Sequence, residues 1–419
     1  MEKYSSGSRK TCLKNVNYFN ENKEFVRGNI YISSGKISKI DHVSEIIQEG
    51  YAVLDASDCY AQPGYTNSHI HPSKDMYCGY SVYDSISNVL DAVHKNNSSE
   101  TEELQFNSSI SSLKKQILSG VTGIGIFTSR ANIDAEAALS LGVRANIQYA
   151  VNDTWVGKES VPVIQNKESI LNQFHDTYSR YSRDTITVSP ATASEISCSD
   201  ELLIALNNLA KEYNSFISLH INEGQHQYNQ CIEHFGKSGI KRLNSLGLLD
   251  SHINLIHNCY LNEDDINIIN QKPETKVIHC PISNSFVGAG TLPVSKLKNS
   301  ISLGTDAAMV NPSNSIVQDT IFALYHHGTD ELHNKINPEK LIDMVTINGA
   351  HCLGFKNCGL IKEGFSADII IYNDEEPYKI NNKTPDINKF IVNMFNKHPK
   401  HVFINGQQLV ENFNFIERM

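Results

Sequence analysis

The sequence has no long hydrophobic run. None of its apolar stretches approaches the roughly 18 to 20 residues that a helix needs to cross a bilayer. Residues 1–10 also lack the apolar core of a secretory signal peptide. We therefore expect a cytoplasmic protein that has no membrane partner.

Positive charge is scarce as well. The 419 residues carry 36 Lys and Arg against 46 Asp and Glu, which gives a net charge of −10. A surface of this average sign repels nucleic acids and anionic membranes, so neither is expected as a main partner. Hydrophobic residues at 40% and charged residues at 20% fit a soluble globular protein. The length suffices for one large domain and a smaller one.

A disulfide pattern is missing too. The nine cysteines form an odd, scattered set, and no Cys-x-x-Cys pair occurs among them. Such a set favours reduced thiols over a disulfide framework. The sequence also has no internal repeat and no low-complexity tract. The alternation of apolar and polar residues is therefore the guide to the fold.

Short strand-like runs occupy both ends of the chain and predict a small β-sandwich. Each run is too short for a helix and is bounded by turn residues. We expect the two ends to pair in one sheet. The runs are residues 14–19, 28–33, 36–40, 52–54, 367–372, 401–406 and 407–410.

The middle of the chain alternates strands with helices. Repeated strand–helix units predict a parallel sheet with helices outside it, and eight such units suggest a closed (β/α)8 barrel of the TIM type. We expect residues 62–355 to form this barrel, and residues 1–61 and 356–419 to form the sandwich. The predicted helices are residues 111–119, 134–141, 167–181, 199–213 and 262–270, with further helical material in 228–246. The predicted strands after the first are residues 121–127, 143–149, 185–189, 216–220, 253–257, 276–280 and 301–306.

Two histidines, His69 and His71, stand at the end of an apolar run within residues 62–72. Alternate side chains share a face of an extended strand, so both rings can face one object, and a shared metal ion is the obvious candidate. An isolated His-x-His is more often a pair of neighbours in a polar turn. The rest of the chain must decide between these interpretations.

Four further residues lie at or just past the carboxyl end of a separate predicted strand: His220, His257, His279 and Asp306. Their successive spacings of 37, 22 and 27 residues are about one strand–helix unit each. The carboxyl ends of barrel strands gather on one face, so these side chains should converge. A single strand histidine is usually a core residue, but a set in matching positions predicts a site.

Neutral imidazoles with one carboxylate suit Zn²⁺ and leave room for a water molecule. A bound metal lowers the pKa of that water towards neutrality, and a proton carrier is then needed. Glu223, three residues after His220, can serve as this carrier. The alternative is an ordinary acidic residue in the first turn of the next helix.

These motifs, taken in order, resemble the amidohydrolase superfamily. Within it they resemble the group that contains methylthioadenosine and S-adenosylhomocysteine deaminases, guanine deaminase and triazine hydrolases. The resemblance covers nearly the whole chain, and the ordered set is far more specific than any one motif. The motifs are Pro63-Gly64, residues 67–71, Gly120-Val-Thr122, Leu141-Gly-Val-Arg144, His220-Ile-Asn-Glu223, His257-Asn-Cys259, His279-Cys-Pro-Ile-Ser-Asn284, Leu303-Gly-Thr-Asp306 and residues 359–369.

The resemblance implies one divalent metal ion, expected to be Zn²⁺, with Fe²⁺ and Mn²⁺ as alternatives. Superfamily members with two metals commonly bridge them with a modified lysine on the fourth strand. The corresponding residues 185–194 contain no lysine, which supports a single metal. The implied metal ligands are His69, His71, His220 and Asp306.

The resemblance also implies roles in catalysis. Glu223 corresponds to the acid that protonates a ring nitrogen of the substrate. His257 corresponds to the histidine that orients the water and stabilises developing charge, and Asp306 would also carry the proton of the attacking water. The implied reaction is hydrolytic deamination of an amino-substituted nitrogen heterocycle of the purine, pyrimidine, pterin or triazine type, with release of ammonia. Homodimers are usual among such relatives.

Two alternatives to deamination stay open. The same site could open a cyclic amide or displace another leaving group. Some relatives of these barrels have lost their ligands and serve as scaffolds, although every expected ligand is present here.

Two residues have two interpretations each. His279 is either a substrate contact or a structural hydrogen-bonding group at the barrel mouth. Arg144, taken to lie at the end of the third strand, either binds an anionic group of the substrate or pairs with a buried carboxylate.

Two segments depart from the relatives. Residues 189–197 lack the histidine that many relatives carry after the fourth strand, which puts adenosine-type substrates in doubt. Residues 74–99 also differ and are expected to form a pocket wall. Tyr77, Tyr80 and Tyr83 could stack on a substrate there, or only pack.

Overall fold

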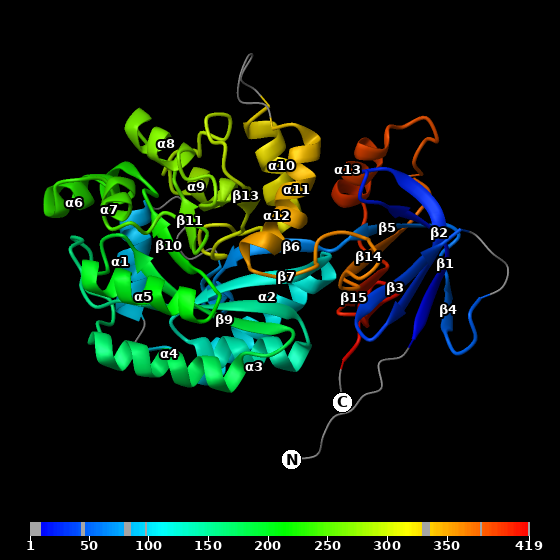
Figure 1. Cartoon of the computed structure of the whole chain (residues 1–419), viewed down its shortest axis with the longest axis horizontal. Helices are drawn as coiled ribbons and strands as arrows, with labels where there is room; N and C mark the ends of the chain where they lie inside the picture. Colours follow the sequence, from blue (N-terminus) through cyan, green and yellow to red (C-terminus); the bar gives the residue numbers. More distant parts are fainter. Residues whose placement is uncertain are drawn as a thin grey trace.

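The computed structural model describes residues 10–42, 47–78, 85–96, 99–328, 336–377 and 379–417. Figure 1 shows two parts: a ring of strands surrounded by helices, and a β-rich part in which the two ends of the chain lie together. Among the helices of these ranges, none is both long enough and apolar enough to cross a bilayer.

Eight parallel strands form the ring, each paired with its neighbours in sequence. The first and last strands meet where the backbone N–H groups of Thr305 and Asp306 donate to the carbonyl of His69, at 3.0 and 2.9 Å. The predicted (β/α)8 barrel is therefore confirmed as a nearly closed ring. Its strands are β6 (Tyr65–Ile70), β7 (Val121–Thr128), β8 (Arg144–Val151), β9 (Ile186–Ser194), β10 (Ile217–Ile221), β11 (Ile253–His257), β12 (Lys276–His279) and β13 (Ile301–Leu303).

Helices cover the outside of the ring (Figure 1). Every residue of β7 and β8 is buried, as expected of parallel strands whose two faces are both covered. The predicted helix over residues 111–119 begins earlier, because Thr101 caps a polar first stretch that has no apolar periodicity. The helices are α2 (Glu102–Leu118), α3 (Ala131–Leu141), α4 (Lys167–Tyr181), α5 (Asp200–Glu212), α6 (Gln225–Phe235), α7 (Gly239–Ser245), α8 (Glu263–Asn270), α10 (Ile316–His326), α11 (Pro338–Val345) and α12 (Ile347–Cys352).

The two ends of the chain form one mixed sheet of nine strands. Its central pairing joins β5 to β14, with Ala61 opposite Ile371, and this confirms that the two ends share a sheet. Leu13, Ile30 and Phe403 belong to its own buried cluster. Helix α13 (Asp386–Asn396) stands between β14 and β15 in the chain and packs against α10 and α11 of the barrel. The strands are β1 (Thr11–Phe19), β2 (Phe25–Ser33), β3 (Lys36–Asp41), β4 (Ala52–Asp55), β5 (Cys59–Pro63), β14 (Ile369–Asn373), β15 (His401–Ile404), β16 (Gln407–Glu411) and β17 (Asn414–Phe415).

The chain passes from the sheet to the barrel at Gly64. Strand β5 pairs with β14 up to Pro63, so the sheet extends two residues beyond the boundary expected after residue 61. A Cβ atom at Gly64 would lie 2.1 Å from Oγ1 of Thr122. Only glycine lets the two parts approach this closely.

Arg144 lies at the amino end of β8, not at the carboxyl end where the sequence analysis put it. Its Nε lies 3.0 Å from Oδ2 of Asp368, and its Nη2 donates to Oγ of Ser366 at 2.7 Å. Both partners belong to the C-terminal segment that joins the chain-end sheet. The structure therefore shows the buried ion pair and contradicts the role in substrate binding. The predicted strand 143–149 already began beside Arg144, so its own boundaries favoured this outcome.

We predict that Arg144→Met destabilises the folded protein, because the site is buried and water cannot replace the lost partner of Asp368. Removal of one partner leaves the carboxylate of Asp368 buried and unpaired, which costs roughly 3 to 5 kcal/mol. Urea-induced unfolding measures the change. The matched control is Arg180→Met, because Arg180 pairs with Glu136 at the surface and such pairs contribute about 0 to 1 kcal/mol. Equal losses in the two variants would contradict the prediction.

Candidate metal centre

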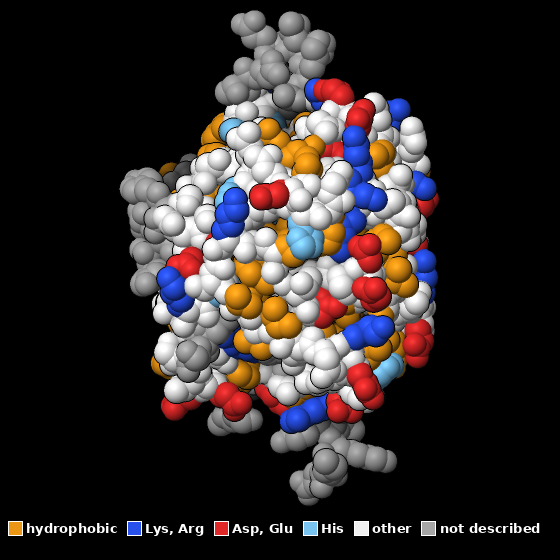
Figure 2. Space-filling model, turned by 90° about the vertical axis from the view of Figure 1, so that its left-hand side faces the viewer, with side chains coloured by type: hydrophobic (Ala, Val, Ile, Leu, Met, Phe, Trp, Pro, Cys, Tyr) orange, Lys and Arg blue, Asp and Glu red, His pale blue; other side chains and the backbone are white. Residues whose placement is uncertain are grey.

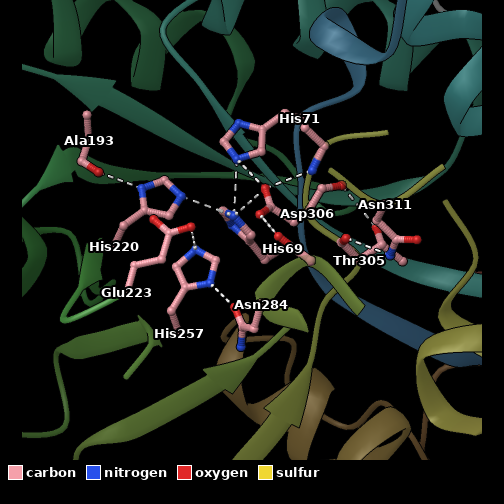
Figure 3. Close-up of polar contacts among 12 residues, drawn as sticks. His69, His71, Ala193, His220, Glu223, His257, Asn284, Thr305, Asp306 and Asn311 are labelled. Atoms are coloured by element: carbon pink, nitrogen blue, oxygen red, sulfur yellow. Dashed lines mark hydrogen bonds and ion pairs between the residues drawn. The ribbon is translucent and has the colours of Figure 1, made fainter. Parts of the chain in front are cut away.

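Three imidazole nitrogens meet at the carboxyl end of the barrel (Figure 3). Nε2 of His69 lies 3.1 Å from Nε2 of His71 and 3.2 Å from Nε2 of His220. Oδ1 of Asp306 lies 3.5 Å from the same atom of His69 and 3.2 Å from that of His71. The structure thus brings together all four residues that the sequence analysis named as metal ligands.

The donor set fits one divalent cation. Nδ1 of His220 lies 2.5 Å from the carbonyl of Ala193 and must donate to it, so Nε2 carries a lone pair. Burial lowers the pKa of His69 to about 4 and that of His220 well below its usual value, so both rings are neutral at neutral pH. Nε2 of His69 can carry at most one proton, so it can donate a hydrogen bond to only one of the three atoms around it, from His71, His220 and Asp306. Ligands held tetrahedrally at 2.0–2.1 Å are about 3.3 to 3.4 Å apart. The distances of 3.1, 3.2 and 3.5 Å from Nε2 of His69 to His71, His220 and Asp306 are close to this value, although His220 does not lie within 4.8 Å of both other ligands at once.

Local backbone geometry aims these side chains. The pairing of β6 with β7 shifts register between Asn67 and Ile70, and this irregularity turns the strand end towards the mouth. Asp306 has a φ of +64°, which an aspartate tolerates better than most residues. The N–H of Ala307 donates to Oδ1 of Asp306 at 2.7 Å, and the hydroxyl of Ser283 donates to Oδ2 at 2.6 Å. The carboxylate is therefore held from both oxygens.

Glu223 and His257 lie beside this cluster (Figure 3). Oε1 of Glu223 is 3.8 Å from Nε2 of His257, and Nδ1 of His257 is 2.8 Å from Oδ1 of Asn284. Burial raises the pKa of Glu223, so its carboxyl group holds a proton more readily than an exposed one. Burial alone would raise the pKa of Asp306 too, but hydrogen bonds with His69 and His71 lower it well below its usual value. The pKa values of the two carboxyl groups are thus shifted in opposite directions, upwards for Glu223 and downwards for Asp306.

The comparisons with known proteins identify the family. The profile of the Amidohydrolase family matches residues 60–409. The chain belongs to this family. It is 28% identical over 394 residues to a 5-methylthioadenosine/S-adenosylhomocysteine deaminase of Caldicellulosiruptor saccharolyticus, covering 91% of this chain and 87% of the relative.

Solved structures share the amidohydrolase fold. An atrazine chlorohydrolase of Arthrobacter aurescens TC1, complexed with zinc, superimposes with a TM-score of 0.87 at 17% identity, covering 98% of this chain and 97% of that one. An adenosine deaminase of Xanthomonas campestris with bound zinc gives 0.86 at 16% identity, covering 98% and 95%.

A cavity of about 710 Å³, including its open mouth, lies over the cluster of three histidines and Asp306. Glu223, His257 and Asp306 line its floor. Its wall is largely apolar, and α1 (Ile86–Asn96) contributes much of it, which confirms the wall expected from residues 74–99. The apolar lining side chains are Ile86, Val89, Leu90, Val93, Trp155, Met309 and Val310.

Of the three tyrosines expected near this wall, the structure describes Tyr77, which does not line the cavity. The hydroxyl of Tyr77 donates to Oε1 of Glu100 at 2.8 Å, and its side chain packs against the buried cluster that contains Val89 and Met309. Tyr80 and Tyr83 lie outside the described residues.

His279 does not line the cavity. Its Nε2 is 3.0 Å from Nε2 of His327, and its Nδ1 is 3.4 Å from Nδ2 of Asn284. Of the two interpretations left open for His279, the structure shows the hydrogen-bonded one and contradicts the substrate contact.

The sequence analysis missed Ser283 and Asn284, which hold Asp306 and His257 from one short helix, α9 (Pro281–Phe286). Both residues stand within the motif that begins at His279. That motif could have indicated them, because polar residues directly after a strand end lie at the same mouth.

We predict that His220→Ala weakens metal binding by more than roughly 100-fold, because loss of groups that only support ligands already costs about 10- to 100-fold. Competition with a chromophoric chelator measures the dissociation constant, and elemental analysis measures the metal content. His234→Ala, on the exposed face of α6, is the control and should bind metal normally. Wild-type protein that fails to retain near-stoichiometric zinc, iron or manganese would favour the scaffold alternative.

Proposed function

We propose that the protein is a metal-dependent hydrolytic deaminase that acts on an amino-substituted nitrogen heterocycle and releases ammonia. The observation that carries this proposal is the convergence of three imidazole nitrogens and one carboxylate oxygen beneath a cavity that Glu223 and His257 also face. Relatives named as deaminases support the choice of reaction.

We propose His69, His71, His220 and Asp306 as the ligands of one Zn²⁺ ion. A metal held there would supply hydroxide at neutral pH by lowering the pKa of water. The zinc in two structural neighbours supports this metal, and Fe²⁺ and Mn²⁺ are the alternatives. Strand β9 contains no lysine that could bridge a second metal.

Each remaining group has one task. Glu223, buried and with a raised pKa, donates a proton to the ring nitrogen as oxygen adds to the adjacent amidine-like carbon. His257 accepts a hydrogen bond from the attacking water at Nε2, because its Nδ1 is already committed to Asn284. Asp306, ionised at neutral pH, takes the proton of that water and returns it to the departing amine. Protonation makes ammonia the leaving group. The proton that remains on the added hydroxyl passes to Glu223 as the C–N bond breaks and the carbonyl forms, which restores the acid.

The cavity supports a flat, weakly polar substrate such as a purine, pyrimidine, pterin or triazine. Its wall is largely apolar, and Ala193 and Ser194 line it in the segment where many relatives carry a histidine. Figure 2 shows the side of the molecule away from the chain-end sheet, where charges of both signs are interspersed with apolar side chains. This pattern supports a small substrate over a polyanion. The expected cytoplasmic location and homodimer stay predictions.

A second candidate is another hydrolysis at the same site, such as displacement of a different leaving group or ring opening. The structural neighbour named as a chlorohydrolase favours this alternative. Product mass separates the reactions, because deamination replaces NH by O whereas ring opening adds one water.

We predict that the zinc-loaded protein releases ammonia from at least one amino-substituted purine, pyrimidine, pterin or triazine. A coupled ammonia assay over such a panel, followed by mass spectrometry of the product, checks this. Protein stripped by a chelator is the control and should be inactive until zinc is restored. Silence across the panel from metal-loaded protein would argue against deamination.

We predict that Glu223→Gln lowers kcat by about 10²- to 10⁴-fold, the usual contribution of a positioned general acid. The amide keeps the shape of the side chain but has no acidic proton, so metal content should be unchanged. Glu233→Gln, on the exposed face of α6, is the matched control. A Glu223→Gln variant with the kcat of the control would exclude this role for Glu223.

A further inference from the structure

His94 of α1 lines two adjoining cavities. One is the cavity over the cluster of three histidines and Asp306, and the other has a volume of about 1250 Å³, including its open mouth. The two cavities share His71, Leu90 and His94 among their lining residues, so they adjoin at this point of the wall. None of the reaction steps proposed above uses His94.

Three contacts hold the imidazole of His94 in place. Its Nδ1 lies 2.5 Å from the carbonyl oxygen of Ser160, in the loop between β8 and α4. Oδ1 of Asp91, about one turn earlier on α1, accepts hydrogen bonds from the N–H and the hydroxyl of Ser160 at 3.0 and 2.6 Å. The ring also meets the indole of Trp155 edge-on, with ring centroids 5.1 Å apart. The imidazole is therefore fixed before a ligand binds.

The proton of the neutral ring lies on Nδ1. A carbonyl oxygen only accepts hydrogen bonds, so Nδ1 of His94 must donate to Ser160. Burial lowers the pKa of His94 below its usual value, so the ring is neutral at neutral pH and Nε2 carries a lone pair. The backbone of Ser160 has only one possible role in this contact, so the assignment depends on no other side chain.

Nε2 of His94 is an open hydrogen-bond acceptor. Among the described residues no donor meets this atom, and it keeps access to solvent. The neighbouring side chains of the wall, such as Val93 and Trp155, are largely apolar. A single acceptor in such a wall discriminates between ligands, because a ligand without a matching donor removes its water and leaves it unpaired.

We propose that His94 is a substrate-binding residue whose Nε2 accepts a hydrogen bond from an N–H or O–H group of the substrate. This role rests on the function proposed above, in which the metal ligands and Glu223 act on the amidine-like carbon and its ring nitrogen. His94 belongs to α1, a different wall of the cavity, so its partner is a donor elsewhere on the substrate. The site thus selects heterocycles that carry a second donor besides the reacting amino group.

Nuclear magnetic resonance with ¹⁵N-labelled histidine tests this contact directly. We expect the ligand-free, zinc-loaded wild type to hold the proton of His94 on Nδ1. The zinc-loaded Glu223→Gln variant is then titrated with adenine, guanine, cytosine, adenosine and melamine, because it should convert them slowly. A heterocycle that binds should shift the Nε2 resonance towards that of a hydrogen-bonded nitrogen. A proton on Nε2 in the free protein, or bound heterocycles that leave Nε2 unshifted, would overturn the proposal.

Two substitutions separate substrate binding from a structural contact. His94→Asn keeps a donor at the position of Nδ1 for Ser160 but has nothing at the position of Nε2. His94→Gln places an amide oxygen near the position of Nε2 and gives up the bond to Ser160. We expect His94→Asn to raise KM roughly 10- to 100-fold with kcat unchanged, because the substrate donor stays unpaired in both the ground state and the transition state. His94→Gln should restore KM towards the wild-type value.

The matched control is His252→Asn. Nδ1 of His252 also meets a backbone carbonyl, that of Ser215 at 2.7 Å, but His252 precedes β11 at the amino end of the barrel. KM should stay unchanged in this variant. Metal content and urea-induced unfolding should match the wild type in both asparagine variants.

The reverse pattern, in which His94→Gln raises KM and His94→Asn does not, would show that His94 only ties α1 to Ser160. An active protein with that pattern refutes the role of His94 and leaves the proposed function intact. A wild-type protein that neither binds nor converts any heterocycle refutes the proposed function and this role with it.

Discussion

The site depends on two backbone hydrogen bonds, from Thr305 and Asp306 to the carbonyl of His69. They join the last strand of the barrel to the first, and they set Asp306 beside the histidines with its backbone in a left-handed conformation. A barrel that did not close here would leave a carboxylate and the imidazoles too far apart to share one cation. Closure of the fold and assembly of the donor set are therefore the same event.

The two ends of the barrel serve different purposes. At the amino end, Gly64 and the buried pair of Arg144 and Asp368 attach the chain-end sheet closely, and these contacts affect stability. At the carboxyl end, three imidazoles, a carboxylate of lowered pKa and a carboxyl group of raised pKa face one cavity, and these groups support chemistry. This division follows from parallel strands, because all of them begin on one face and end on the other.

Much of the fold was predictable because its signals are local. Apolar strands, capped helices and glycine stops recur along the chain, and the helix predicted at residues 167–181 has the bounds of α4 because Asn166 caps it. The ligand set was predictable for a related reason. The carboxyl ends of all the parallel strands lie at one face of the barrel, so polar residues at those ends meet there. By contrast, α2 begins nine residues before its prediction, because a polar first stretch carries no apolar stripe.

The sequence by itself determined the class of fold, the residues at the strand ends and the chemistry of their donors. Only the tertiary structure decided which polar groups pair across long separations. The partner of Arg144 comes from the far end of the chain, and His327 meets His279 from a separate helix. A strand end points where the local backbone directs it, whereas such a pairing depends on how distant segments pack, and no local pattern records that packing.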